Sequence, residues 1–286
     1  MNIPNLHIFT STELRFVREV QLTADVYAFH FKPQKPLKHR AGQAGFLTVP
    51  GGGTKFLTLS SSPDDEEAVF ATHIHPASTF KQALKRLHPG DAVKFRGPFI
   101  GTTLGNKHGT QVVFLAQGIG ITPHRSILRY IAHNKLPVHA TLIHVGRSGH
   151  PFREETQTLA TEAYFPESAD EFKRQVLEVA GKQPDAAYYV AGGLRFYAST
   201  LRLLKQLGIK SSAIHHDRLP NYMNKSVITP YHDLTDWRRK RAQRDLTGPD
   251  REGTDASGVT GHRWRLRTAA ARRKGSSRER DAAARS

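Results

Sequence analysis

A short glycine-rich string is the part of this sequence best suited to chemistry. Residues 112–116, Val-Val-Phe-Leu-Ala, form the apolar run expected of a strand buried on both faces, as in a parallel sheet. Gly118 and Gly120 follow in a turn, where missing side chains let the backbone bend and a ligand approach. Pro123, just inside the expected helix, gives up an amide that would lack a partner, and Thr122 can cap. The free amides and the helix dipole there suit an anion, most simply a dinucleotide pyrophosphate.

Taken alone, the string has two interpretations. It lacks the third glycine of Gly-x-Gly-x-x-Gly, so a plain tight turn is the alternative. Residues 118–123, Gly-Ile-Gly-Ile-Thr-Pro, resemble the nicotinamide-nucleotide motif of the ferredoxin–NADP reductase family. The resemblance implies a flavin-binding β-barrel before this point and a nucleotide domain from it onward. It also implies nucleotide contacts from Gly118, Gly120, Thr122 and Pro123.

Composition limits the class of protein. With 286 residues, 38% of them hydrophobic, the chain could hold two modest domains or one large one. No stretch approaches the ~20 apolar residues of a membrane span, and the N-terminus lacks signal-peptide features, so a cytoplasmic location is expected. The absence of cysteine excludes thiolate zinc sites and cysteine-ligated iron–sulfur clusters, and no metal site is expected. A net charge of +17 favours acidic partners or loose nucleic-acid binding without choosing between them.

The first hundred residues show the alternation of half-buried antiparallel strands. Residues 13–33 predict two strands joined by a turn at 23–25, and residues 41–49 and 69–75 predict further strands. Residues 87–101 resemble the Gly-Asp…Gly-Pro hairpin that closes the family's barrel.

The strand that contains Lys55, Phe56, Leu57 and Thr58 resembles the family's flavin motif. The resemblance implies that Lys55 holds a flavin phosphate, that Leu57 packs on the isoalloxazine and that Thr58 lies near its reactive N5. Lysine lacks arginine's bidentate fork, and leucine lacks aromatic stacking worth ~0.5–1.5 kcal/mol, so weaker retention of flavin is expected. A half-buried strand running into a serine turn is the alternative. FAD is preferred over FMN by resemblance only.

Ser78 and Thr79 open the next expected helix, for which Ser78 is a candidate N-cap. In the family the corresponding turn presents hydroxyl and amide groups to the flavin pyrophosphate. Ordinary capping is the alternative, and the two interpretations are compatible. His73, on the strand before this turn, is included among the expected cofactor residues. Because His73 and His75 lack partners at metal-ligand spacing, both are interpreted as barrel residues rather than metal ligands.

After the glycine string, residues 138–145 predict a second parallel strand and so complete a β-α-β unit. Arg147 and Ser148 follow at its carboxyl end, where open α/β sheets bind ligands. The resemblance implies that they meet the adenosine ribose or its 2′-phosphate, which favours NADPH; a solvated surface arginine is the alternative. A helix over 171–180, ended by Gly181, is expected next.

Residues 187–193, Ala-Tyr-Tyr-Val-Ala-Gly-Gly, resemble a later strand and turn of the family. The resemblance implies that Gly192 and Gly193 contact the nicotinamide nucleotide. Ala191 stands where the family has a cysteine beside the nicotinamide, so slower hydride transfer is expected.

Residues 213–222 look like the family's last strand and its aromatic ending. Asp217 stands where an acid is usual and joins Thr58 as a catalytic candidate, and Tyr222 is expected near the flavin. From residue 224 onward, low apolar content and dense charge predict a disordered basic tail. Contact of this tail with nucleic acid or an acidic membrane remains open beside a purely solvated appendage.

The motifs together predict an antiparallel flavin-binding β-barrel at 8–105, a doubly wound NAD(P)-binding α/β domain at 106–223 and a basic tail at 224–286. They imply hydride transfer from NAD(P)H to FAD and onward electron transfer to a separate acceptor. A ferredoxin-like protein, a free flavin, ferric iron, a quinone and oxygen all remain open as acceptors. The alternative is a non-enzymatic binding protein on a decayed reductase fold, which contacts nucleic acid or an acidic partner through its tail.

Overall fold

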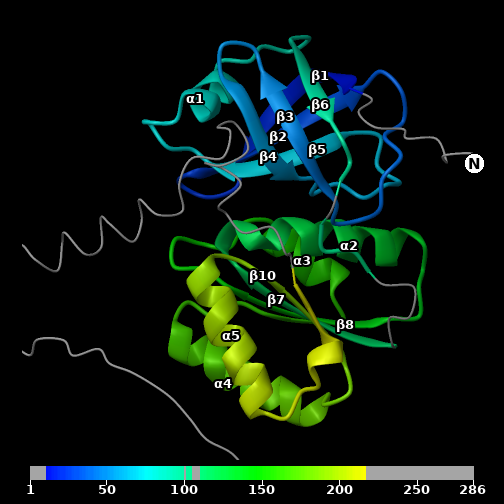
Figure 1. Ribbon diagram of the computed structural model, residues 1–286, viewed down its shortest axis with the longest axis vertical. Coiled ribbons are helices and arrows are strands. Elements are labelled where there is room, and N and C mark those ends of the chain that lie inside the picture. Colours follow the sequence, from blue (N-terminus) through cyan, green and yellow to red (C-terminus); the bar gives the residue numbers. More distant parts are fainter. Residues whose placement is uncertain (1–10, 100, 105–109, 217–286) are drawn as a thin grey trace, which may run out of the picture. The chain divides into compact units, whose positions relative to one another are not determined.

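The computed structural model describes residues 11–99, 101–104 and 110–216 (Figure 1). The described residues all belong to one compact unit. The predictions for Asp217, Tyr222 and the tail lie outside the described residues. Among the described helices, none has the length and apolar composition needed to cross a membrane.

The first sheet is antiparallel and curls into a near-barrel, which confirms the predicted architecture. Its strand order is β4-β3-β6-β1-β2-β5, so β4 and β5 are the two edges. An isolated bridge joins Leu59, just after β4, to Phe70 on β5. Helix α1 packs on β3 and β4. The elements are β1 (Ser11–Gln21), β2 (Val26–Pro33), β3 (Ala44–Val49), β4 (Gly53–Thr58), β5 (Ala68–His73), α1 (Thr79–Lys85) and β6 (Ala92–Arg96).

Strand alternation fills the barrel with aromatic rings. Phe31 on β2 meets Phe16 and Phe70 edge-on, with ring centroids 5.6 and 6.0 Å apart. Phe80 and Leu84 of α1 enter the same core. Because burying such a side chain contributes ~1.5–3 kcal/mol, the aromatic core holds α1 firmly against the sheet.

The second sheet is parallel, with order β11-β10-β7-β8-β9, the doubly wound pattern that the sequence predicts. Its strands are β7 (Gln111–Gln117), β8 (His139–Val145), β9 (Glu162–Tyr164), β10 (Ala187–Ala191) and β11 (Ile214–His216). Its helical segments are η1 (Gly118–Gly120), α2 (Ile121–His133), α3 (Arg153–Leu159), α4 (Ala169–Lys182), α5 (Leu194–Gln206) and η2 (Ser211–Ala213).

Helices cover both faces of the parallel sheet (Figure 1). On β7, Val113 and Leu115 pack towards α4 and α5, whereas Val112 and Phe114 pack towards α2. Burial of the strand on both sides explains why residues 112–116 are continuously apolar instead of alternating.

Local predictions from the sequence are partly confirmed. The turn between β1 and β2 is where it was expected, and the Ser78 hydroxyl caps α1 by accepting the Lys81 amide. The prediction that Thr122 caps α2 is wrong: η1 starts the helix earlier, and the Thr122 hydroxyl donates to the Ile119 carbonyl instead. Gly181 does not end α4, which continues to Lys182. Helix α3 and strand β9 were not predicted, because both are short and lack a sustained apolar period.

Two buried histidines lie behind the glycine turn. His124 of α2 and His144 of β8 have no solvent exposure. Burial, together with the nearby His144, lowers the pKa of His124 to about 3. Burial likewise lowers the pKa of His144 to about 4, although its bond to the Gly118 carbonyl opposes the shift. Both rings are therefore neutral at pH 7. Because a carbonyl can only accept, Nε2 of His144 carries the proton that it donates to Gly118, at 2.9 Å.

The free energy of unfolding should fall as the pH is lowered from 6.5 towards 4. Both histidines take up protons near pH 6.5 when unfolded but only near pH 4 and 3 when folded, so the unfolded chain binds more protons in this window. Each histidine then contributes a slope of up to ~1.4 kcal/mol per pH unit, and neither contributes above this range. Urea unfolding at a series of pH values measures the slope. His124→Phe should make it shallower, and an unchanged slope would contradict this explanation.

Gly120→Ala should destabilise the fold by ~1–3 kcal/mol through overpacking. A Cβ on Gly120 would lie 2.3 Å from the Ala191 carbonyl oxygen and 2.9 Å from the Gly192 Cα, both of them backbone atoms. Gly181→Ala is the matched control, because a Cβ there has no neighbour within 4 Å and the helix should gain up to ~1 kcal/mol. Urea unfolding of both variants checks the difference, and equal effects would show that the contact at Gly120 does not limit the packing.

Candidate functional site

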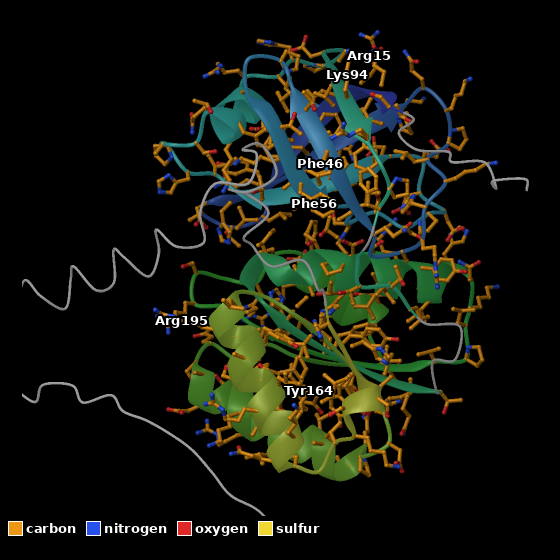
Figure 2. The ribbon with its side chains drawn as sticks, viewed as in Figure 1. Arg15, Phe46, Phe56, Lys94, Tyr164 and Arg195 are labelled. Atoms are coloured by element: carbon orange, nitrogen blue, oxygen red, sulfur yellow. The ribbon has the colours of Figure 1, made fainter. Side chains whose placement is uncertain are left out.

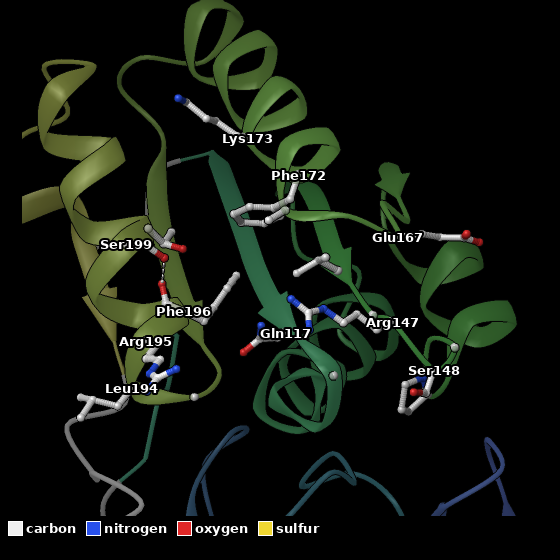
Figure 3. Close-up of a pocket in the computed structure, with 18 of the residues that line it drawn as sticks. Gln117, Arg147, Ser148, Glu167, Phe172, Lys173, Leu194, Arg195, Phe196 and Ser199 are labelled. Atoms are coloured by element: carbon white, nitrogen blue, oxygen red, sulfur yellow. Dashed lines mark hydrogen bonds between the residues drawn. The ribbon is translucent and has the colours of Figure 1, made fainter. Parts of the chain in front are cut away.

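A pocket of about 1130 Å³ lies at the carboxyl edge of the parallel sheet (Figure 3). It opens where the chain leaves β7 at Gln117 and Gly118 and where it leaves β8 at residues 145–149. The strand order reverses between β7 and β10 at this place, the position where open α/β sheets bind ligands. Gly193, the N-cap of α5, lines the pocket as well. The pocket therefore faces backbone amides at a helix start, a favourable place for an anion.

The glycine turn of the motif forms part of this pocket and of its support. Gly118 adopts a left-handed conformation with φ +51°, and it lines the pocket. Gly120 lies against Ala191 and Gly192, so the turn packs directly on the end of β10. Close backbone contact of this kind leaves no room for side chains.

The remaining predicted residues of this turn have different surroundings. Thr122 and Pro123 are buried in the first turn of α2. Gly192 packs against Phe196, whose ring would lie 2.6 Å from an added Cβ. Of the two glycines after β10, Gly193 is the one that lines the pocket. Ala191, in the position of the family's cysteine, is buried.

Basic side chains gather around the pocket. Arg147 and Ser148, both predicted, are exposed and line it, and Figure 3 shows Arg147 pointing towards the strand end that carries Gln117. The sequence did not identify three further basic residues of the lining, Lys173, Arg195 and Arg202. None of these four cations forms an ion pair with another described residue.

The charge of the lining fits a phosphorylated ligand. Glu167, Asp170 and Asp25 offset part of the positive charge, but the basic groups are in excess. Cations without carboxylate partners, next to helix-start amides, are what a dinucleotide with several phosphates requires. The lining therefore fits NAD(P)H.

Residues of the barrel complete one side of the pocket. Thr23 and Asp25 from the β1–β2 turn line it together with His73 at the end of β5. His73 Nδ1 lies 3.1 Å from a carboxylate oxygen of Asp25, and Thr23 donates to the same carboxylate. His73 thus has an acidic partner that its position in the sequence did not reveal. The pocket is therefore bounded by both sheets.

The predicted flavin strand, β4, is an edge of the barrel. Leu57 packs against the barrel core, and by strand alternation Lys55 shares its face. Phe56 lies on the other face beside Phe46, with ring centroids 4.9 Å apart (Figure 2). Thr58 is the last residue of the strand. The structure thus separates Phe56 from Lys55 and Leu57.

Helix α1 adds a second basic group near Lys55. Ser78 caps the helix and Thr79 is its first residue. Burial lowers the pKa of Lys81, and the positive charge of Lys55 lowers it further. Neither lysine forms an ion pair within the described residues. Two amines that repel each other beside a capped helix start fit the phosphates of a flavin dinucleotide.

Comparison with known proteins adds distant relatives. No family model matches the chain. The gamma subunit of sulfhydrogenase 1 from Pyrococcus furiosus is 28% identical over 154 residues, which cover 51% of this chain and 52% of that subunit. The reductase component DmpP of phenol 2-monooxygenase from a Pseudomonas species is 27% identical over 112 residues, 38% of this chain and 32% of that protein. The match therefore spans about half or less of these relatives.

Solved structures share the fold over a larger part of the chain. The cytochrome P450 reductase GcoB from Amycolatopsis has a TM-score of 0.63 at 18% identity, covering 73% of this chain and 69% of that one. Ferredoxin–NADP+ reductase from Plasmodium falciparum has a TM-score of 0.59 at 16% identity, covering 72% and 95%. The FAD/NAD binding domain of nitric oxide dioxygenase from Vibrio cholerae has 0.61 at 21% identity, covering 72% and 97%. The chain therefore shares the fold of these solved structures and is distantly similar in sequence to the sulfhydrogenase subunit and to DmpP.

Proposed function

We propose that this chain is a FAD-dependent NAD(P)H oxidoreductase that passes electrons to a separate acceptor. The observation that carries the proposal is the pocket bounded by both sheets, with His73 on the barrel side and, on the α/β side, cations that form no ion pair within the described part of the chain. A binding site shared by the two sheets would bring a nucleotide held at one to a flavin held at the other. Purely structural contact between the sheets would not need unpaired charge there.

On the nucleotide side, the proposal assigns binding to backbone and basic groups. The turn at Gly118 and the start of α5 at Gly193 would hold the pyrophosphate through amides. Arg147 and Ser148 would meet the adenosine ribose and its 2′-phosphate, so we propose NADPH as the preferred donor. Arg195 would neutralise further phosphate charge from the first turn of α5. Gly120 and Gly192 would act beneath the ligand, by allowing the turn to pack closely.

On the flavin side, Lys55 and Lys81 would hold the pyrophosphate of FAD, with Ser78 and Thr79 at the start of α1. Thr58, at the end of β4, would donate a hydrogen bond near the flavin N5. Leu57 would offer an apolar contact rather than a stacked ring.

The redox step belongs to the cofactors. A bound FAD would supply the redox chemistry, which is acceptance of a hydride from NAD(P)H followed by release of its two electrons to an acceptor and of the proton to solvent. The protein's part is to orient the two cofactors and to limit the access of water. Three curated relatives have names that describe parts of larger systems: a sulfhydrogenase subunit, a monooxygenase reductase component and an electron transfer subunit. These names support a separate protein as the acceptor, and the net charge of +17 favours an acidic one.

Reconstitution with FAD tests the proposal. The purified full-length chain is mixed with FAD, separated from free flavin, and its visible spectrum is followed during anaerobic addition of NADPH or NADH. Retained flavin absorbance that bleaches with nucleotide, faster with NADPH, is the expected result. A protein that stays colourless after mixing with FAD would contradict the proposal and favour the non-enzymatic alternative.

Lys81→Gln should weaken FAD binding by about tenfold, because it removes one charge-assisted contact with the pyrophosphate. Quenching of flavin fluorescence on titration with apoprotein measures the dissociation constant. Lys85→Gln is the matched control on the same helix, since Lys85 pairs with Glu19 and should not face the flavin. Equal losses in the two variants would argue for a general effect of charge.

Arg147→Gln should raise the KM for NADPH by about tenfold or more and leave the KM for NADH within about twofold, because only NADPH carries the 2′-phosphate. Steady-state reduction of ferricyanide with each nucleotide provides both constants. Arg174→Gln, on α4 and outside the pocket lining, serves as control. If Arg147→Gln raised the KM for NADPH and the KM for NADH equally, the Arg147 side chain would not contact the 2′-phosphate.

A further inference from the structure

Helix α2 links the nucleotide turn to the chain segment that follows the flavin strand. It begins directly after Gly120, and in its second and third turns Arg125, Ser126 and Arg129 point to the barrel segment 60–65. That segment follows Thr58 at the end of β4. A single rigid helix therefore connects the two places at which the cofactors are proposed to bind.

Arg125 makes the most buried of these contacts. Arg125 is only 6% exposed to solvent. Nη1 donates to the Ser60 carbonyl at 2.7 Å, while Nε and Nη2 donate to the two carboxylate oxygens of Glu155 at 2.6 and 3.0 Å. The guanidinium carbon lies 4.3 Å from the centre of the Phe152 ring. Three directed hydrogen bonds and a ring contact leave this side chain little freedom.

Ser126 makes a second link from the same helix turn. Its hydroxyl donates to the Ser61 carbonyl and accepts the amide of Gly42 at 3.0 Å. Both partners belong to the barrel, and the hydroxyl is fully buried. The segment after β4 is thus held at two successive carbonyls by two successive residues of α2.

Arg129, one turn further along α2, completes the connection at a more exposed position. Nε and Nη2 donate to both carboxylate oxygens of Asp65, at 2.8 and 2.6 Å, and Nη1 donates to Glu155. Asp65 in turn accepts the amide of Ser62 at 2.7 Å, which fixes the turn after β4. We call Arg125, Arg129, Glu155 and Asp65 the arginine clamp.

We propose that the arginine clamp is a positioning device that sets the distance between the nucleotide at the glycine turn and the flavin beside β4. The proposal rests on the proposed function, because it concerns the geometry of that reaction. None of the clamp residues lines the pocket, so they act through α2 and the segment 60–65 rather than by touching a ligand. Misplacement of reacting atoms by about 1 Å can cost about 100-fold in rate, so such a connection would control reduction without controlling affinity.

A clamp that serves stability alone predicts a different outcome. In that case the flavin of a folded variant would be reduced at the wild-type rate. The variant would differ from the wild type only in a lower unfolding temperature. A positioning role instead predicts a slower reduction rate in a folded, fully loaded protein. The two roles are separated by measuring binding and rate in the same preparation.

The test uses Arg129→Gln in the FAD-loaded full-length protein, because Arg129 is partly exposed and its loss leaves the buried Arg125 bonds in place. Stopped-flow reduction by NADPH gives the limiting rate and the dissociation constant separately. The limiting rate should fall about 10- to 100-fold, with the dissociation constants of NADPH and FAD within about twofold of the wild type. Reoxidation of the dithionite-reduced protein by ferricyanide should be unchanged. Arg129→Lys should recover part of the rate, because a single amine can form some but not all of the hydrogen bonds that the guanidinium forms with Asp65 and Glu155.

A second readout does not depend on turnover. Binding of NADP+ to the oxidised wild type should perturb the visible flavin spectrum, and this perturbation should be lost in Arg129→Gln although NADP+ still binds by calorimetry. Arg153→Gln is the matched control, since Arg153 on α3 lies over Phe165 and makes no clamp contact among the described residues.

An unchanged limiting rate in Arg129→Gln, or a rate loss accompanied by equal losses in nucleotide and flavin affinity, would overturn the positioning role. Failure of the proposed function has a different signature: the wild-type protein itself would not bind FAD or would not be reduced by NADPH. The limiting rate of Arg129→Gln relative to that of the wild type therefore tests the arginine clamp. FAD binding and reduction by NADPH in the wild type alone test the proposed function.

Discussion

The buried guanidinium of Arg125 is the constraint on which the relation between the two sheets depends. A guanidinium cannot lose its proton inside a protein, so a buried one must be surrounded by acceptors. Burial lowers the pKa of Arg125, and the Glu155 carboxylate opposes that change. Glu155 comes from α3 and the Ser60 carbonyl from the barrel, so one side chain fixes three elements at once. Removing Glu155 would leave this buried guanidinium without the carboxylate that compensates its charge.

The same helix start meets a second constraint, close backbone packing. Gly120 lies against the end of β10 and leaves no space for a Cβ, and His144 holds the Gly118 carbonyl from below. The glycine turn is therefore fixed by β8, β10 and α2 together. Above it, cations that pair with no carboxylate among the described residues surround an open pocket. Rigid support below and unpaired charge above is the arrangement expected of a preformed anion site.

The sequence predicted those features that depend on local pattern. The apolar run at 112–116 is buried on both faces, and the Ser78 cap follows from side-chain chemistry within four residues. The doubly wound architecture of the second domain followed from resemblance rather than from pattern alone. Thr122 was assigned the wrong role because the 3-10 turn before α2 moves the helix start, a shift that propensities do not resolve.

Features that depend on distant contacts were not predictable. Asp25 meets His73 across 48 residues, and Arg125 meets Ser60 across 65. The basic residues of α4 and α5 are ordinary exposed positions in the sequence, and only the folding of both helices onto one sheet edge brings Lys173 and Arg195 to the same pocket. The charge pattern of a helix does not predict which edge of a sheet its basic side chains will face.

The measurement that tests the account most directly is the isotope dependence of flavin reduction. NADPH with deuterium at one or the other position of nicotinamide C4 is mixed with the FAD-loaded protein, and a single turnover of bleaching is followed. We expect slower bleaching for deuterium at one of the two positions only, because the clamped sheets would present one face of the nicotinamide to the flavin. Bleaching that is equally fast with both labelled forms and with unlabelled NADPH, or no bleaching at all, would contradict this expectation.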